Sequence, residues 1–241
     1  MERALAGDMR RIFRKIAAAA ARHVLDGHAH SAPNVAQRFD GEIRTAMERR
    51  MIAAATASAR LTYGHLVGGG KAWAPFDETK LISLLDVVQR TIRNWLTSYG
   101  AAKVRNIVET TRKAIRKALV KGAEESEPPR IIARRIRDEV GGEIAKARSL
   151  TIARTEIGTA SSVGQDEAAR VTNLTLDKVW NATEDHRTRP DHAAANGQRV
   201  AMDAMFTVGG VALRYPRDPD GPAAQVINCR CVCTYEPRLP K

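Results

Sequence analysis

Residues 179–235 read VWNATEDHRTRPDHAAANGQRVAMDAMFTVGGVALRYPRDPDGPAAQVINCRCVCTY, and this stretch differs in pattern from the rest of the chain. Short runs of apolar and β-branched residues are separated by Gly, Pro and Asn, which predicts strands joined by tight turns. Asn196-Gly197 predicts one such turn, Gly209-Gly210 a hairpin, and Asp191–Asn196 a short helical turn. The predicted strands begin near Leu174 and continue at 205–208, 211–215 and 226–235.

Upstream of this stretch, apolar residues recur at helical spacing. Asp77 is a candidate N-cap for the longest helix, and Gly68-Gly69-Gly70 before it is a predicted flexible joint. The Gly-rich joint lacks the Lys-Ser/Thr that a phosphate-binding loop requires. Helices are predicted at 2–25, 34–63, 77–99, 101–121, 131–140 and 143–170.

The polar, proline-marked segment Glu124–Pro129 is the predicted domain boundary. It separates a basic amphipathic helical region, 1–124, from a C-terminal domain, 125–241. The predicted fold class is α+β: a mainly α-helical N-terminal region and a small C-terminal α+β domain with a short antiparallel sheet.

The formal net charge is +12, and the whole excess lies within residues 1–150. Such an excess attracts polyanions without reading their sequence, and no base-reading motif is present. No run approaches the length of a membrane span, and the cysteine pattern gives no disulfide framework, so a cytosolic protein is expected. The candidate polyanion contacts are Arg112, Lys113, Arg116, Lys117, Lys121, Arg134 and Arg135.

Three chemical interpretations of the C-terminal residues stay open. Cys229, Cys231 and His192 are ligand types that suit Zn²⁺, although Cys-x-Cys is closer than the spacing of most zinc sites. Cys229 could instead be a nucleophile with His192 as its base and Asp185 orienting the base. The third interpretation has no turnover and no metal: the cysteines are small buried apolar residues, and Asp185, Arg187, Arg189 and Asn228 form a buried polar network.

The same residues resemble a known family, the phage Mu F-like minor head proteins, also called phage head morphogenesis proteins. The resemblance covers roughly residues 125–236 and the first 120 residues carry none of it. Arg189 and His192 stand where some relatives have cysteines. The matching residues are Ala153-Arg154-Thr155-Glu156, Trp180, Thr183, Asp185, Arg187-Thr188-Arg189, His192, Asn196-Gly197, Tyr215-Pro216, Asp218-Pro219 and Asn228-Cys229-Arg230-Cys231.

The resemblance implies a structural role in the virion, in the head interior, after assembly in the host cytoplasm. It implies a minor capsid protein near the portal that acts in capsid assembly and in DNA packaging or ejection. The implied partners are the portal protein, the major capsid or scaffolding protein, and phage DNA bound without sequence specificity. The matching residues are then structural and not catalytic, and no cofactor is expected. The alternative function is a metal- or cysteine-dependent, hydrolase-like enzyme carried by the C-terminal domain.

Overall fold

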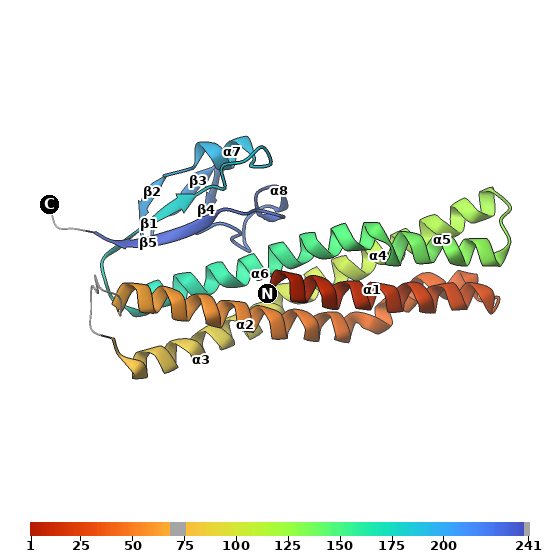
Figure 1. The fold of residues 1–241 in the computed structure, drawn as a ribbon, viewed down its shortest axis with the longest axis horizontal. Helices are drawn as coiled ribbons and strands as arrows, with labels where there is room; N and C mark the ends of the chain where they lie inside the picture. The colour runs from red at the N-terminus through yellow and green to blue at the C-terminus, as the bar shows by residue number, and fades with distance from the viewer. Residues whose placement is uncertain (68–75, 239–241) are drawn as a thin grey trace. The chain divides into compact units, whose positions relative to one another are not determined.

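The computed structural model describes residues 1–67 and 76–238 (Figure 1). The chain forms two compact units that are interleaved along the sequence, so two long helices, α2 (Asp40–Val67) and α6 (Glu143–Val171), contribute residues to both. The predicted regions 1–124 and 125–241 divide the chain at one point, and that division stays a prediction. The first unit contains Met1–Arg50 and Asn94–Ala153, and the second contains Met51–Arg93 and Arg154–Lys241.

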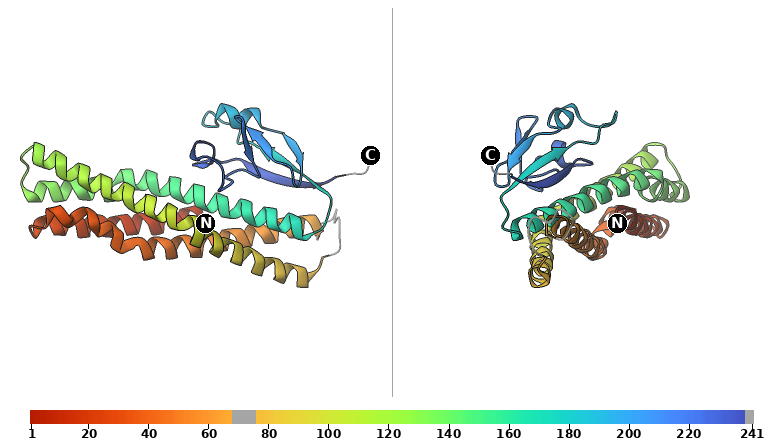
Figure 2. Two further views of the ribbon diagram at one scale, coloured as in Figure 1. Left: turned by 180° about the vertical axis from the view of Figure 1, so that it is seen from behind. Right: turned by 60° about the vertical axis from the view of Figure 1, so that its left-hand side comes forward.

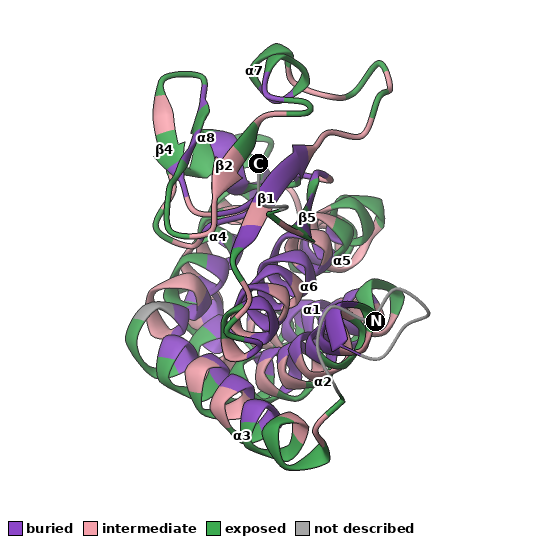
Figure 3. Cartoon of the chain, turned by 90° about the vertical axis from the view of Figure 1, so that its left-hand side faces the viewer, coloured by how far each residue is buried: buried purple, intermediate pink, exposed green. Residues whose placement is uncertain are grey.

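The first unit is a set of packed helices. α1 packs against α5 and η1, and α4 packs against the same two elements. Buried residues such as Met9, Phe13 and Ile16 recur on α1 at helical spacing, and Figure 3 shows this recurrence along the helices. Besides the first parts of α2 and α6, the unit contains α1 (Glu2–Leu25), the 3-10 helix η1 (Ala29–Phe39), the π-helix η2 (Leu96–Gly100), α4 (Ala101–Glu124) and α5 (Pro129–Gly141).

The helix boundaries follow local chemistry. The Lys80 amide donates to Asp77 Oδ1 at 3.0 Å, which confirms Asp77 as the N-cap of α3 (Glu78–Trp95). The predicted helix 34–63 is wrong at its start, because η1 extends to Phe39 and α2 begins at Asp40. Pro33 lacks an amide hydrogen and suits the short 3-10 segment better than an α-helix interior. The predicted joint Gly68-Gly69-Gly70 lies outside the described residues.

The second unit contains two small antiparallel sheets that lie beside the second half of α6, and this can be followed from the front in Figure 1 and from behind in Figure 2. A three-stranded sheet has the order β2-β1-β5, and β3 pairs with β4 as the predicted hairpin. In the larger sheet Trp180 lies opposite Cys233, and Val179 lies opposite Arg199. The elements are β1 (Leu176–Asn181), α7 (Pro190–Ala194), β2 (Arg199–Ala201), β3 (Phe206–Val208), β4 (Val211–Leu213), α8 (Ala223–Val226) and β5 (Val232–Pro237).

The core of these strands is aromatic. Trp180 and Phe206 are fully buried, and their rings meet edge to face at 5.4 Å. Lys178 is also buried, at 1 % exposure, with its ammonium group 5.4 Å from the Phe206 ring. The fold is therefore mainly helical with short antiparallel strands near the C-terminus, which confirms the predicted fold class. No helix among residues 1–67 and 76–238 has an apolar stretch long enough to cross a membrane.

The predicted closing strand over residues 226–235 is wrong in its first half. Residues Ala223–Val226 form α8, Asn228 has a left-handed φ of 59°, and β5 begins only at Val232. Cys229 and Cys231 therefore lie in a turn and only Cys233 lies on the strand. Strand β2 is an element that the sequence pattern did not predict, because it is only three residues long and none of its residues is buried.

Candidate functional site

The side chains of His192, Cys229 and Cys231 meet inside the second unit. His192 lies on α7, and the two cysteines lie in the turn before β5. The His192 Nδ1 atom is 3.3 Å from Cys231 Sγ and 3.5 Å from Cys229 Sγ. All three residues are buried, and their ligand atoms lie within 4.8 Å of one another. The structure thus brings together the three residues predicted as zinc ligands.

Two hydrogen bonds in series orient the imidazole of His192. Its Nε2 atom is 2.8 Å from Gln225 Oε1, and Gln225 Nε2 donates to Asp191 Oδ2 at 3.1 Å. A carboxylate only accepts hydrogen bonds, so the amide nitrogen of Gln225 faces Asp191 and its oxygen faces His192. The His192 Nε2 atom therefore carries a proton, and Nδ1 faces the sulfur atoms. The rings of Trp180 and His192 meet edge to face, with their centroids 5.5 Å apart.

The contacts within this group shift the pKa values of its three members. The hydrogen bond from Cys231 is the largest effect on Cys229, and it lowers the pKa of that thiol. Burial raises this pKa, but the hydrogen bond with His192 and the positive charge of Arg217 also lower it, so the net shift is downward. The hydrogen bond to Cys229 raises the pKa of His192. The pKa of Cys231 is raised by its hydrogen bond to Cys229 and by burial. Both shifts act in the same direction: relative to isolated side chains, they favour the charged forms of Cys229 and His192.

Side chains from three other segments hold the turn that carries the cysteines. The Asn228 amide donates to Thr155 Oγ1 at 2.9 Å, and Arg154 donates to Asn228 Oδ1 at 2.6 Å. Arg154 and Thr155 thus act as structural partners of the turn. Three carbonyl oxygens of the turn also have partners: Ile227 accepts from Arg189 at 2.6 Å, Cys229 from Arg217 at 3.1 Å, and Arg230 from Thr183 at 3.1 Å.

Asp185 is paired with Arg230 and not with His192. Both carboxylate oxygens accept from the Arg230 guanidinium, and the Arg187 amide adds a hydrogen bond at 2.9 Å. These contacts, with the Arg230 bonds the largest, hold the pKa of Asp185 well below its usual range. The prediction that Asp185 orients His192 is wrong, because Gln225 occupies that position. The cation that pairs with Asp185 is Arg230, which was not among the residues of the predicted polar network.

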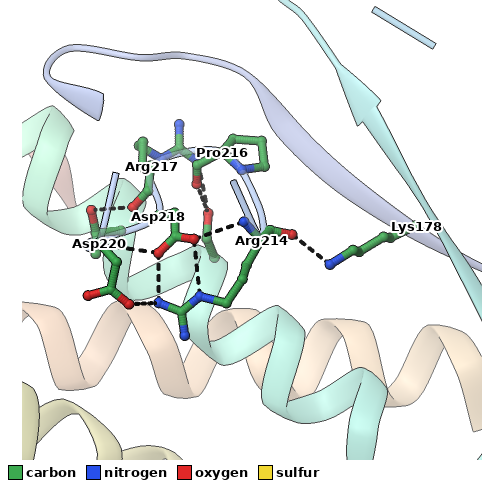
Figure 4. A network of polar contacts seen from close by, with 8 residues as sticks. Lys178, Arg214, Pro216, Arg217, Asp218 and Asp220 are labelled. Atoms are coloured by element: carbon green, nitrogen blue, oxygen red, sulfur yellow. Dashed lines mark hydrogen bonds and ion pairs between the residues drawn. The ribbon is translucent and has the colours of Figure 1, made fainter. Parts of the chain in front are cut away.

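The segment Arg214–Gly221 forms a second polar cluster, shown in Figure 4. Asp218 is 3 % exposed and accepts from the Arg214 backbone amide at 2.8 Å and from the Arg214 guanidinium at 2.7 and 3.0 Å. The carbonyl oxygen of Arg214 accepts a hydrogen bond from the ammonium group of Lys178 at 2.7 Å. The Pro216 carbonyl accepts from Ser162 of α6 at 2.8 Å. This cluster fixes the loop to α6 and to β1.

Arg217 links the two clusters. It is buried and has a φ of 64°. Its carbonyl oxygen accepts a hydrogen bond from the Thr159 hydroxyl on α6, and its guanidinium donates one to the Cys229 carbonyl oxygen. A Cβ atom at Gly158 would stand 2.3 Å from Arg217 Nε, so only glycine leaves room for this side chain. The left-handed backbone at a non-glycine residue costs free energy that these contacts offset.

Residues 109–234 match the family described as Phage Mu protein F like protein. The chain belongs to the Phage Mu protein F like family. The matched region includes the turn with Asn228-Cys229-Arg230-Cys231, the Arg214–Gly221 loop and the Arg154-Thr155 pair, which are the segments that contact one another in the structure.

Three curated proteins resemble this Mu F-like chain. The minor head protein GP7 of Bacillus phage SPP1 is 34% identical over 158 residues, which are 62% of this chain and 49% of GP7. The NAD(+)–arginine ADP-ribosyltransferase EFV of Enterococcus faecalis (strain ATCC 700802 / V583) is 38% identical over 104 residues, 42% of this chain and 20% of EFV. The uncharacterized protein YqbB of Bacillus subtilis (strain 168) is 24% identical over 147 residues, 59% of this chain and 47% of YqbB.

The chain therefore spans about half or less of the length of the curated relatives it matches. No solved structure matches this Mu F-like chain. The ADP-ribosyltransferase activity in the name of EFV belongs to that protein, of which one fifth aligns here.

The predicted polyanion contacts of this Mu F-like chain divide into exposed and engaged side chains. Arg112 is bonded to Glu109 and Asn34, and Arg135 is bonded to Glu125 and Glu127. The engaged arginines are neutralised within their own unit. The exposed members of the predicted set are Lys113, Arg116, Lys117 and Lys121 on α4 and Arg134 on α5. Of these, Lys121 also forms a surface ion pair with Glu125 at 3.9 Å.

Other residues of the family motif have structural positions. Trp180 is in the core, Glu156 is buried at 5 % exposure, and Gly197 has a φ of 76° and donates to the Trp180 carbonyl at 2.8 Å. Arg187 is exposed, with a long contact to Asp185 at 3.7 Å. Gln225 and Gly158 were missed by sequence reasoning because neither residue type carries a signal for such roles. Arg214, Arg217 and Asp218 lay in a recognised motif, and their opposite charges at close spacing were the available signal.

Proposed function

We propose that this chain is a minor head protein: a structural component of a phage head that acts in capsid assembly and in DNA packaging or ejection. Family membership carries the proposal, together with the relative in phage SPP1 that bears this name and aligns over 62% of the chain. The proposed location is the head interior near the portal, after assembly in the host cytoplasm. The proposed protein partners are the portal protein and the major capsid or scaffolding protein.

The proposed contact with DNA rests on one face of α4. Lys113, Lys117 and Lys121 recur every four residues, so they point to the same side of the helix, and Arg116 lies beside them. These residues line a groove of about 500 Å³ together with Val120, Glu124 and Glu125. From Lys113 to Lys121 the basic side chains extend over roughly 12 Å along the helix axis. They can neutralise several DNA phosphates without contacting the bases.

The proposal includes no catalytic turnover by the C-terminal residues. Cys229 is 2 % exposed, and the cavity beside it, about 10 Å³, holds roughly one water molecule. A nucleophile requires a substrate carbon at close range, and this cavity is too small to admit one. The partner expected of a general base, an orienting carboxylate on His192, is replaced by Gln225. A thiol-directed substrate probe that labels Cys229 in the folded protein would contradict this part of the proposal.

The first experiment is co-purification. The tagged chain is expressed together with the portal protein of the same phage genome, and separately with its major capsid or scaffolding protein. The proposal expects a complex that survives size-exclusion chromatography with at least one of these partners. Failure to form a complex with any of them would refute the role in the head.

The second experiment measures DNA affinity against salt concentration. A variant with Lys113, Arg116, Lys117 and Lys121 changed to Gln should lower the magnitude of the slope of log K against log salt by about 3 to 4, since each phosphate contact contributes about 0.9. The matched control removes the same charge from exposed residues outside α4 and should retain the slope. An equal loss in the control would refute the assignment to α4. The control changes Arg3, Arg14, Arg22 and Arg38 to Gln.

A further inference from the structure

We propose that His192, Cys229 and Cys231 are three protein ligands of a zinc ion that ties α7 to the turn before β5. The inference does not rest on a role in a phage head. The three residues offer one imidazole nitrogen and two sulfur atoms, a donor set that suits Zn²⁺. All three are buried.

The separations of the donor atoms fit a tetrahedral ion. With Zn–S near 2.3 Å and Zn–N near 2.0–2.1 Å, the nitrogen and each sulfur of a tetrahedral site are separated by roughly 3.5 Å. The observed distances from His192 Nδ1 are 3.5 Å to Cys229 Sγ and 3.3 Å to Cys231 Sγ. Both nitrogen–sulfur distances therefore lie within about 0.2 Å of the tetrahedral value, and all three ligand atoms lie within 4.8 Å of one another.

The surroundings of His192 prepare its Nδ1 atom for a metal. Zinc-bound histidines donate their other ring N–H to an oxygen, which fixes the ring and its tautomer. Here Nε2 meets Gln225 Oε1 at 2.8 Å, and Asp191 fixes the amide of Gln225 at 3.1 Å. This chain of bonds leaves Nδ1 as the atom that faces the sulfurs.

The fourth ligand is a solvent molecule or a small anion. Among the described residues, the ligand group contains no fourth His, Cys, Asp or Glu. Nearby, His186 is exposed, and Asp185 is held by Arg230. The cavity of about 10 Å³ that adjoins the ligands is enough for one such species.

The ion would act as a cross-link. Residues 192 and 229 are 37 positions apart, and the elements that carry them are short, so few backbone hydrogen bonds hold them together. Metal binding to a preformed buried site adds directly to the stability of the folded state. The aromatic core near Trp180 and the turn at Asn228 would both be stabilised.

The test begins with the intact wild-type chain. It is expressed in zinc-supplemented medium and purified with a reductant, and its zinc content is measured by elemental analysis. The expected result is close to one zinc ion per chain, and replacement by Co²⁺ should give a thiolate-to-cobalt charge-transfer band in the near ultraviolet. Removal of the metal with a chelator should lower the melting temperature. A chain that binds neither zinc nor cobalt under these conditions would overturn the proposal.

Variants then identify the ligands. Cys229→Ser and Cys231→Ser should each lower the affinity for zinc at least tenfold. Cys233→Ser is the matched control. Cys233 is buried to the same extent, at 2 %, but lies on β5 outside the ligand group, so it should retain zinc and the cobalt band. Gln225→Leu should weaken zinc binding 10- to 100-fold. Equal loss in Cys233→Ser, or full zinc content in Cys229→Ser, would overturn the assignment, and circular dichroism verifies that each variant folds.

Discussion

The close approach of α6 to α2 within the second unit makes Gly164 a sensitive position. A Cβ atom there would stand 2.1 Å from the Ala55 carbonyl oxygen and 2.8 Å from the carbonyl carbon. Carbon and oxygen in a close nonbonded contact are about 3.3 Å apart, so Gly164→Ala requires a separation of about 1 Å between the two backbones. The obstructing atom is a carbonyl in the middle of α2, which cannot rotate away as a side chain would.

Two effects of opposite sign determine the result of Gly164→Ala. Forcing extra volume into a packed contact costs about 1–3 kcal/mol. Replacing glycine by alanine inside a helix gains up to about 1 kcal/mol. The steric cost is the larger, so the free energy of unfolding should fall by about 1–2 kcal/mol. For a chain of this size the melting temperature should drop by roughly 2–8 °C.

Gly64 provides the matched control because it lies on α2 in the same unit, and nothing lies within 4 Å of a Cβ atom built there. Gly64→Ala should therefore raise the free energy of unfolding by about 0.5–1 kcal/mol. Thermal unfolding followed by circular dichroism, with urea titration for the free energy, measures both variants. If Gly164→Ala stabilises the protein as Gly64→Ala does, the close approach of the two helices is refuted.

Three further predictions concern the polar contacts and the turns. Asp218→Ala should cost about 2–3 kcal/mol in urea unfolding, because the backbone amide of Arg214 loses its acceptor and the Arg214 guanidinium keeps Asp220 but loses Asp218. Asp218→Asn should cost less, and equal costs would contradict this explanation. Burial raises the pKa of Asp8, but hydrogen bonds such as that from Arg50 (2.9 Å) outweigh burial and lower it overall. The ionised Asp8 therefore contributes its full stabilisation above about pH 4, and this stabilisation is lost as the pH falls through the lowered pKa of the folded state. The stability difference between wild type and Asp8→Asn should therefore shrink on acidification, and a difference that grew would refute the ion pair. Asn173, with a φ of 56° after α6, should tolerate Gly, whereas Val should cost about 1–2 kcal/mol by thermal unfolding; a harmless Val would exclude the left-handed turn.

Local patterns predicted the helices and the hairpin because their signals lie within one turn or one strand. Residues 2–25 and 143–171 are helical nearly as the apolar spacing indicates, and β3 and β4 flank Gly209-Gly210 as expected. The closing strand was less predictable. The alternation of three cysteines favoured a strand, but the left-handed Asn228 and its bond to Thr155 decide the turn, and that partner is 73 residues away in the sequence.

The sequence by itself determined the residue types of this site, the charge on the basic helical half and the motifs of the Phage Mu protein F like family, because each is a property of the chain read in order. Only the tertiary structure decided which residues are partners. Asp185 bonds to Arg230, and Gln225 takes the place beside His192 that Asp185 was expected to occupy. Both pairings depend on α7, α8 and the turn at Asn228 converging in space. Sequence cannot rank such contacts, because hydrogen-bond energies depend on distances between segments and not on separation along the chain.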